Sequence, residues 1–128
     1  MDSTPGGGRR ILVVDNDERS RAFMRERLTA WGYDVLEAEN GQSGRIRMIN
    51  DSAPHPIHGA LLDVYMPMPD GLASLHVLRQ AHPGIPVIVM SEASNIQTAR
   101  EAINQGAQEY VLKPFDHELL KMKCMRVF

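Results

Sequence analysis

The chain has 128 residues, a single cysteine and a net charge of -2, which suits one globular domain. A single cysteine excludes an intramolecular disulfide framework and favours a reducing, cytoplasmic setting. The weak net charge gives no sign of a nucleic-acid or membrane partner, and the apolar runs are too short to span a bilayer.

The Gly-rich residues 1–8 lack the apolar run of a secretory signal, and we expect a flexible tail there, followed by one domain over residues 9–128. Apolar and β-branched runs predict strands at Ile11–Val14, Tyr33–Ala38, Gly59–Leu62, Ile85–Met90 and Glu109–Leu112. Helices are expected over about Glu18–Trp31 and Gln42–Asn50, after a cap at Asp70, from Ile96 to Gly106, and from Phe115 onward. Strands that alternate with helices predict a doubly wound α/β fold with a five-stranded parallel sheet in the order 2-1-3-4-5, as in flavodoxin-like folds.

Polar residues follow four of these strands. They are Asp15 with Asn16, Asp63, Ser91 and Lys113. A single Asp at such a point is ordinarily a helix cap or a turn former. In the predicted strand order, however, these four strand ends are neighbours, so their side chains are expected to share one cleft.

The residue types in this cleft indicate a chemistry. Carboxylate and amide oxygens are ligands for a hard cation such as Mg²⁺. A carboxylate beside such a cation can attack phosphorus as a nucleophile, and a lysine can neutralise phosphoryl oxygens. A serine hydroxyl can donate a hydrogen bond to the new phosphoryl group.

Several segments, in order along the chain, resemble the receiver domain of bacterial two-component response regulators. They are Ile11–Glu18, Leu62–Pro67, Asp70-Gly71, Val89–Ser91 and Tyr110–Phe115. The resemblance implies a phospho-receiver of a phosphorelay, a signalling switch rather than a turnover enzyme, which catalyses its own phosphorylation and its slow hydrolysis.

The resemblance also assigns roles to matching positions. Asp63 is the expected phosphoacceptor and Lys113 the expected phosphoryl contact, with a cis Lys113-Pro114 bond. The expected Mg²⁺ ligands are Asp15, Asn16, Asp63 and the Tyr65 main-chain carbonyl. Ser91 and Tyr110 are the expected switch pair, and the less favoured alternative for Tyr110 is a plain strand residue with no switching role.

Three residues depart from the family pattern. Asn16 stands where a second acid is usual in the family, so we expect weaker Mg²⁺ binding than in a typical receiver. Asp17 could supply the missing carboxylate, but it lies one residue further along the chain, where its side chain can point away from the site. Glu92 follows Ser91, where a small residue is common, and Tyr65 is bulky beside the phosphate position. We expect both to alter the lifetime of the phosphoryl group.

The expected partners are a sensor histidine kinase or phosphotransfer protein, and downstream an output domain, another protein or a second copy of the chain. Arg19, Arg21, Arg25 and Arg27 make the first helix either a solvated face or a docking surface for the donor. The chain leaves no residues for a DNA-recognition module, so direct nucleic-acid binding is not expected.

Two alternative functions remain. The first is a degenerate receiver that binds partners without phosphorylation, which Asn16 favours. The second is a cofactor-binding flavodoxin relative, which the first strand–helix turn disfavours because it lacks a Gly-rich or Ser/Thr-rich phosphate cradle.

Overall fold

A computed structural model describes residues 6–50, 56–64 and 71–128. Its strands are β1 Arg10–Val14, β2 Asp34–Ala38, β3 Gly59–Asp63, β4 Val87–Glu92 and β5 Glu109–Lys113. Its α-helices are α1 Glu18–Ala30, α2 Gly41–Asn50, α3 Gly71–Ala81, α4 Ile96–Asn104 and α5 His117–Val127. The strands form one parallel sheet in the order β2-β1-β3-β4-β5, which confirms the flavodoxin-like prediction.

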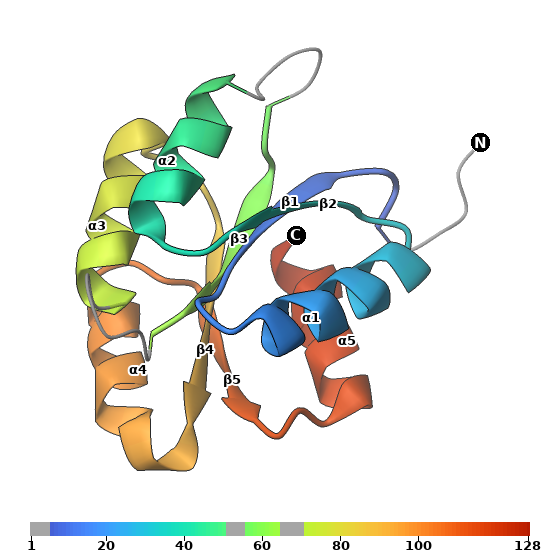
Figure 1. Ribbon diagram of the computed structural model, residues 1–128. Helices are drawn as coiled ribbons and strands as arrows, with labels where there is room; N and C mark the ends of the chain where they lie inside the picture. The colour runs from blue at the N-terminus through green and yellow to red at the C-terminus, as the bar shows by residue number, and fades with distance from the viewer. Residues whose placement is uncertain (1–5, 51–55, 65–70) are drawn as a thin grey trace.

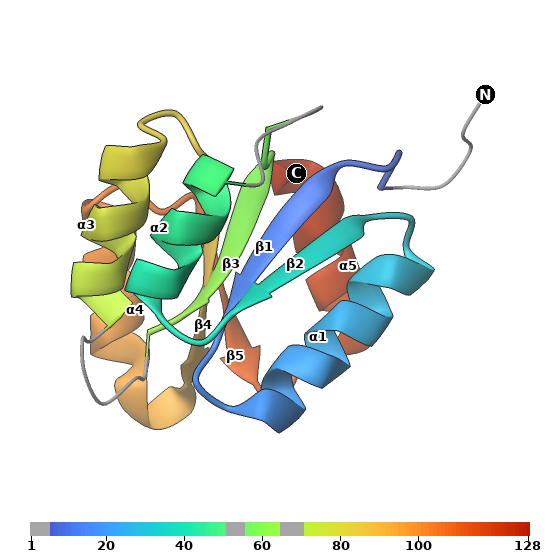
Figure 2. The ribbon, with the colours of Figure 1, turned by 45° about the horizontal axis from the view of Figure 1, so that its top comes forward.

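Helices cover both faces of this sheet (Figures 1 and 2). Helices α1 and α5 lie on one face, and α2, α3 and α4 lie on the other. Each face has its own apolar cluster, because successive strand residues point to opposite sides. Leu12 and Val14 of β1 belong to the α2–α4 side, whereas Ile11 and Val13 belong to the α1–α5 side.

The central strands are buried on both faces, as their continuous apolar runs predicted. All five residues of β3 are buried, and so are Ile11 to Val14 of β1. Parallel strands covered by helices on both sides have no solvated face, so alternation between polar and apolar residues disappears. The polar residues of this region are therefore displaced to the strand ends.

The main differences from the sequence prediction lie in the second and fourth strands and at the start of the last helix, while other boundaries shift by a residue or two. The fourth strand begins at Val87 instead of Ile85 and continues to Glu92, because Pro86 has no N–H to give to a neighbouring strand. The second strand begins at Asp34, since the Tyr33 N–H bonds the Leu28 carbonyl at the end of α1. Helix α5 begins at His117, where the Asp116 carboxylate caps it by accepting from the Leu119 N–H.

Gly44, which lowered the helix propensity of α2, has a packing role. A Cβ placed there would lie 3.1 Å from Leu78, 3.3 Å from Leu12 and 3.3 Å from Val14. The glycine therefore lets α2 approach β1 and α3 closely.

Part of the expected N-terminal tail contacts the domain. The Gly6 N–H donates to the Trp31 carbonyl at 2.6 Å, and the Gly8 N–H donates to the Gly32 carbonyl at 2.8 Å. Gly6 is buried against this turn between α1 and β2. Residues 1–5 of the expected tail lie outside the described residues.

Two further observations concern the helices. In the part of the chain that the structure describes, no helix has the length and apolar character needed to cross a membrane. Cys124 of α5 is fully buried, its backbone carbonyl accepts a hydrogen bond from the Tyr33 hydroxyl at 3.2 Å, and burial raises the pKa of its thiol to about 12.

Candidate functional site

The predicted polar residues lie at one edge of the sheet. Asp15 directly follows β1, Asp63 ends β3, Ser91 lies near the end of β4 and Lys113 ends β5. Because β1, β3, β4 and β5 are adjacent in the sheet and run in parallel, their carboxyl ends meet at this edge.

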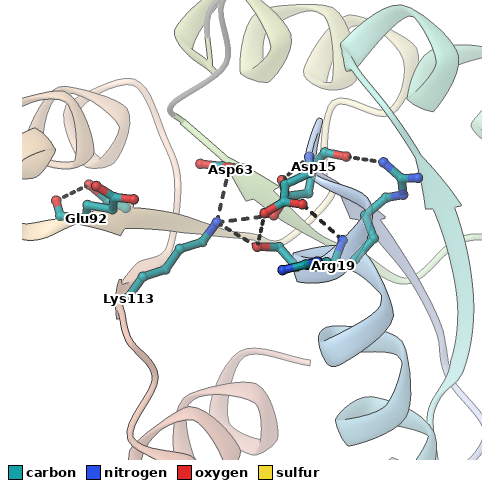
Figure 3. A network of polar contacts seen from close by, with 9 residues as sticks. Asp15, Arg19, Asp63, Glu92 and Lys113 are labelled. Carbon is teal, nitrogen blue, oxygen red and sulfur yellow. Dashed lines mark hydrogen bonds and ion pairs between the residues drawn. The ribbon is translucent and has the colours of Figure 1, made fainter.

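Lys113 joins the two carboxylates (Figure 3). Its Nζ lies 3.2 Å from Asp63 Oδ2 and 3.3 Å from Asp15 Oδ2. Asp15 is fully buried, Asp63 is nearly so, and the Lys113 side chain is 20% exposed. Two largely desolvated carboxylates therefore share one ammonium, and the three groups together carry a net negative charge.

Burial sets the protonation of this cluster. The pKa of Asp15 is raised from 3.8 to about 6. Desolvation by burial is the largest cause and the neighbouring Asp63 acts in the same direction, while the Asp17 N–H and Lys113 oppose the rise. Burial alone lowers the pKa of Lys113, but Asp63 and Asp15 outweigh it, so the net shift is upward. A second cation at this edge would relieve the repulsion between the two carboxylates.

The backbone around Asp15 is held by α1 and β2. The Asp17 N–H donates to Asp15 Oδ1 at 2.9 Å, and the Arg21 guanidinium donates to the Asp15 carbonyl at 2.7 Å. Arg21 also pairs with Glu37 at 3.5 Å, which ties the end of β1 to β2 through α1. The side chain of Asn16 next to Asp15 is exposed, so its amide oxygen is free to face solvent.

Ser91 and Tyr110, the expected switch pair, occupy different surroundings. The Ser91 hydroxyl is buried and donates to the Glu92 carbonyl at 2.9 Å. The Tyr110 ring is half-buried, and the Lys123 ammonium lies 5.1 Å from its centroid. Lys123 Nζ also donates to the Tyr110 carbonyl at 2.7 Å, so Tyr110 contacts α5.

Glu92 lies opposite Lys113 in the register of β4 and β5. Glu92 is exposed and lines a cavity together with Ala93, Ser94, Lys113 and Pro114. An additional acid therefore lines a cavity that Lys113 also lines. Lys113-Pro114 is a cis peptide bond, which confirms that expectation.

Tyr65, whose carbonyl is an expected metal ligand, lies outside the described residues, and so does the expected helix cap Asp70. Among the residues the structure does describe, no group of three or more His, Cys, Asp or Glu side chains gathers as a metal site. Asp15 and Asp63 nevertheless fit a Mg²⁺ ion, which is commonly held by one or two carboxylates and keeps several waters.

A groove of about 400 Å³ opens beside Lys113, between α1 and the segment that leads into α5. It is lined by Arg19, Ser20, Phe23, Lys113, Pro114, Phe115 and His117. The Phe23 ring stacks on Phe115 at 5.7 Å between centroids and lies 5.6 Å from His117. The groove therefore joins an aromatic wall to the cationic end of the site.

The arginines of α1 are mostly engaged within the domain. Arg21 and Arg25 both pair with Glu37, at 3.5 and 2.8 Å. The Arg27 guanidinium lies 5.2 Å from the Phe23 centroid. The helix is therefore less basic toward solvent than its sequence indicates.

Sequence reasoning missed Ser20. Its hydroxyl oxygen lies 3.3 Å from Lys113 Nζ and 3.4 Å from Asp17 Oδ2. Asp17 also accepts from the Arg19 N–H at 3.0 Å as the cap of α1. The position of Ser20, three residues after that cap, was the available signal, because it places the hydroxyl over the start of the helix at the strand edge.

The fold and the site define a class of protein: small flavodoxin-like α/β domains with an acidic cluster and a lysine at the carboxyl edge of the sheet. The family model of the response regulator receiver domain matches residues 11–124. The chain therefore belongs to the receiver domains of two-component response regulators, which are signalling domains.

Curated relatives and solved structures agree with this assignment. The chain is 34% identical over 111 residues to the transcriptional regulatory protein ZraR of Escherichia coli strain K12, and the match covers 87% of this chain and 24% of ZraR. The receiver domain of NtrX from Brucella abortus superposes with a TM-score of 0.81 at 34% identity, covering 91% of this chain and 96% of that chain. Chemotaxis protein CheY4 of Vibrio cholerae shares the fold, with a TM-score of 0.81 at 23% identity, covering 94% of this chain and 98% of that chain. This chain spans about a quarter of the length of the curated relatives it matches.

Proposed function

We propose that this receiver domain accepts a phosphoryl group on Asp63 from a phosphohistidine of a sensor kinase or phosphotransfer protein. The observation that carries the proposal is the position of Lys113, whose ammonium lies 3.2 Å from the Asp63 carboxylate and 3.3 Å from the Asp15 carboxylate. The Lys113 ammonium is thus within hydrogen-bond distance of both the nucleophilic carboxylate of Asp63 and the neighbouring carboxylate of Asp15.

The proposed transfer is a substitution at phosphorus. A carboxylate oxygen of Asp63 forms a bond to phosphorus while the phosphorus–nitrogen bond of the donor breaks, and the electron pair stays on the imidazole. The Lys113 ammonium stabilises the negative charge on the phosphoryl oxygens. Hydrolysis reverses the state: water attacks phosphorus, the bond to Asp63 breaks, and the carboxylate is restored with release of inorganic phosphate.

Mg²⁺ is the proposed cofactor. Asp15, Asp63, Asn16 and the Tyr65 carbonyl would hold it. A bound Mg²⁺ supplies charge neutralisation for the phosphoryl oxygens and orients them for in-line attack. The support is the donor set itself, in which two desolvated carboxylates share a single lysine and carry excess negative charge.

The proposed output is a change at the face formed by α4, β5 and α5. The Ser91 hydroxyl would turn from the Glu92 carbonyl toward the phosphoryl group, and Tyr110 would follow into the vacated space. Leu112, Leu119 and Met122 expose apolar side chains on β5 and α5, which supports a partner surface there. The partner would be an output domain, another protein or a second copy of this chain, in the cytoplasm, and the chain would act as a switch rather than a turnover enzyme.

A second candidate is a receiver that binds its partners without phosphorylation. Asn16 favours it, because a neutral amide stands where the site could hold a third carboxylate. The two candidates differ in whether Asp63 gains a phosphate in the presence of Mg²⁺.

Intact-mass spectrometry tests the proposal. The chain and Asp63→Asn are each incubated with Mg²⁺ and acetyl phosphate, and with a chelator as control. We expect a single-phosphate mass gain in the native chain that is absent in the variant and abolished by the chelator. No gain at any Mg²⁺ concentration, from acetyl phosphate or from a phosphohistidine donor, would favour the unphosphorylated binding module.

A further inference from the structure

Ser20 is the third partner of the Lys113 ammonium. Its Oγ lies 3.3 Å from Lys113 Nζ, the same separation as that between Nζ and Asp15 Oδ2. An ammonium has three N–H donors, and in this site each has one acceptor. Two of these acceptors are the carboxylates and the third is the Ser20 hydroxyl, so the network drawn in Figure 3 connects α1 to the end of β5.

The Asp17 carboxylate orients the Ser20 hydroxyl. Its Oγ lies 3.4 Å from Asp17 Oδ2, a carboxylate that is exposed and caps α1. When the hydroxyl donates its hydrogen to Asp17, its lone pairs are left for the lysine. Asp17 thereby stabilises the Lys113 ammonium indirectly, through Ser20, although Asp17 itself does not contact the carboxylate cluster.

We propose that Ser20 is a positioning residue that keeps the Lys113 ammonium at the site when a divalent cation binds Asp15 and Asp63. The inference rests on the proposed function. A cation held by the Asp15 and Asp63 carboxylates would compete with Lys113 for the negative charge of the same two groups. Ser20 stands outside that competition, because a neutral hydroxyl already held by Asp17 is a poor ligand for a hard cation beside two carboxylates.

The contribution of Ser20 to the stability of the Lys113 ammonium then differs between the cation-free and the cation-bound site. Without the cation, its bond is one of three to the ammonium. With the cation bound, the two bonds to the carboxylates are weakened and the bond to Ser20 is not, so the Ser20 bond carries a larger share of the stabilisation of an ammonium whose side chain is only 20% exposed. Ser20 therefore assists cation binding by lowering the free energy needed to displace Lys113 from the carboxylates.

Calorimetric Mg²⁺ titration of the native chain and of Ser20→Ala tests this role. We expect Ser20→Ala to weaken Mg²⁺ binding about five-fold, the scale of the net contribution of one typical hydrogen bond. Ser20→Thr keeps the hydroxyl and should bind Mg²⁺ within about two-fold of the native chain. Ser43→Ala on α2 is the matched control, since Ser43 is a similarly half-buried helical serine whose backbone N–H bonds Asn40 instead of the Lys113 network, and it should have no effect. Circular dichroism before each titration confirms that each variant is folded.

A double-mutant cycle with Lys113→Met shows whether Ser20 acts through the lysine. In that background the ammonium is gone, so Ser20→Ala should leave Mg²⁺ affinity unchanged. An equal loss in both backgrounds, or no loss in the native background, would overturn the inference. If the native chain itself bound no Mg²⁺, the metal-dependent function would fail, and this inference with it. Normal binding with an inert Ser20→Ala would refute the role of Ser20 alone.

Discussion

At the carboxyl edge of the sheet, Lys113 pairs with Asp63 and Asp15, whose side chains are only 8% and 0% exposed. At the amino edge, Arg10 pairs with Asp34 at 3.6 Å, and the Asp34 side chain is 65% exposed. Water screens the pair at the amino edge, whereas the cluster at the carboxyl edge depends on its own members for neutralisation. The comparison indicates that the exposed pair contributes little to stability, whereas the buried cluster is sensitive to the loss of any one of its charges.

The largest expected effect comes from removing the shared cation. Lys113→Met leaves two desolvated carboxylates without their ammonium, and we expect it to lower the free energy of unfolding by about 2–4 kcal/mol at pH 8. Asp34→Asn breaks the exposed pair at the amino edge and should cost less than about 1 kcal/mol. Urea unfolding of both variants measures the difference, and equal losses would remove the distinction between the two edges.

The next effect is a gain in stability that depends on pH. The pKa of Asp15 is raised to about 6, so the folded chain holds this proton more tightly than the unfolded chain does. The resulting stability is present below about pH 4 and is lost as the pH rises through about 6. Asp15→Asn removes that loss and should stabilise the fold by about 3 kcal/mol at pH 8, with the gain shrinking toward pH 4. Urea unfolding across this range tests the prediction, and a gain independent of pH would contradict it.

The smallest expected effect concerns Asn16. Asn16→Asp adds a third carboxylate beside Asp15 and Asp63, and we expect it to tighten Mg²⁺ binding several-fold, on the order of 1 kcal/mol. Calorimetric titration at fixed ionic strength measures the change. Asp34→Asn serves as the control for a change of net charge far from the site. Unchanged affinity in Asn16→Asp would show that position 16 lies outside the reach of the cation.

The sequence alone predicted the sheet and most of the strand-edge residues for a physical reason. In a parallel sheet covered on both faces, polar residues are excluded from the strands, so Asp15, Asp63 and Lys113 stand out against apolar runs. The strand order then fixes which of these ends are neighbours.

Contacts between distant segments were harder to predict. Ser20 lies 93 positions from Lys113 in the chain and sits among charged residues typical of a solvated helix, so its residue type gave no signal of a contact. The one available signal was its position three residues after the Asp17 cap, which places it at the strand edge but names no partner. The contact of Tyr110 with Lys123 likewise depends on how α5 packs along β5. Likewise, the run Ile85–Met90 looked like one strand, because the effect of Pro86 on pairing depends on which side of the strand its neighbour occupies.

The single cysteine makes the opening of α5 measurable by thiol labelling. Cys124 lies on the buried face of α5, toward the sheet, and burial raises the pKa of its thiol to about 12, so an alkylating reagent reaches it only when that helix separates from the sheet. The rate of thiol labelling therefore reports how often α5, one of the three elements of the proposed output face, opens. Because the chain has no other thiol, the motion can be timed on the unaltered protein, without an added probe.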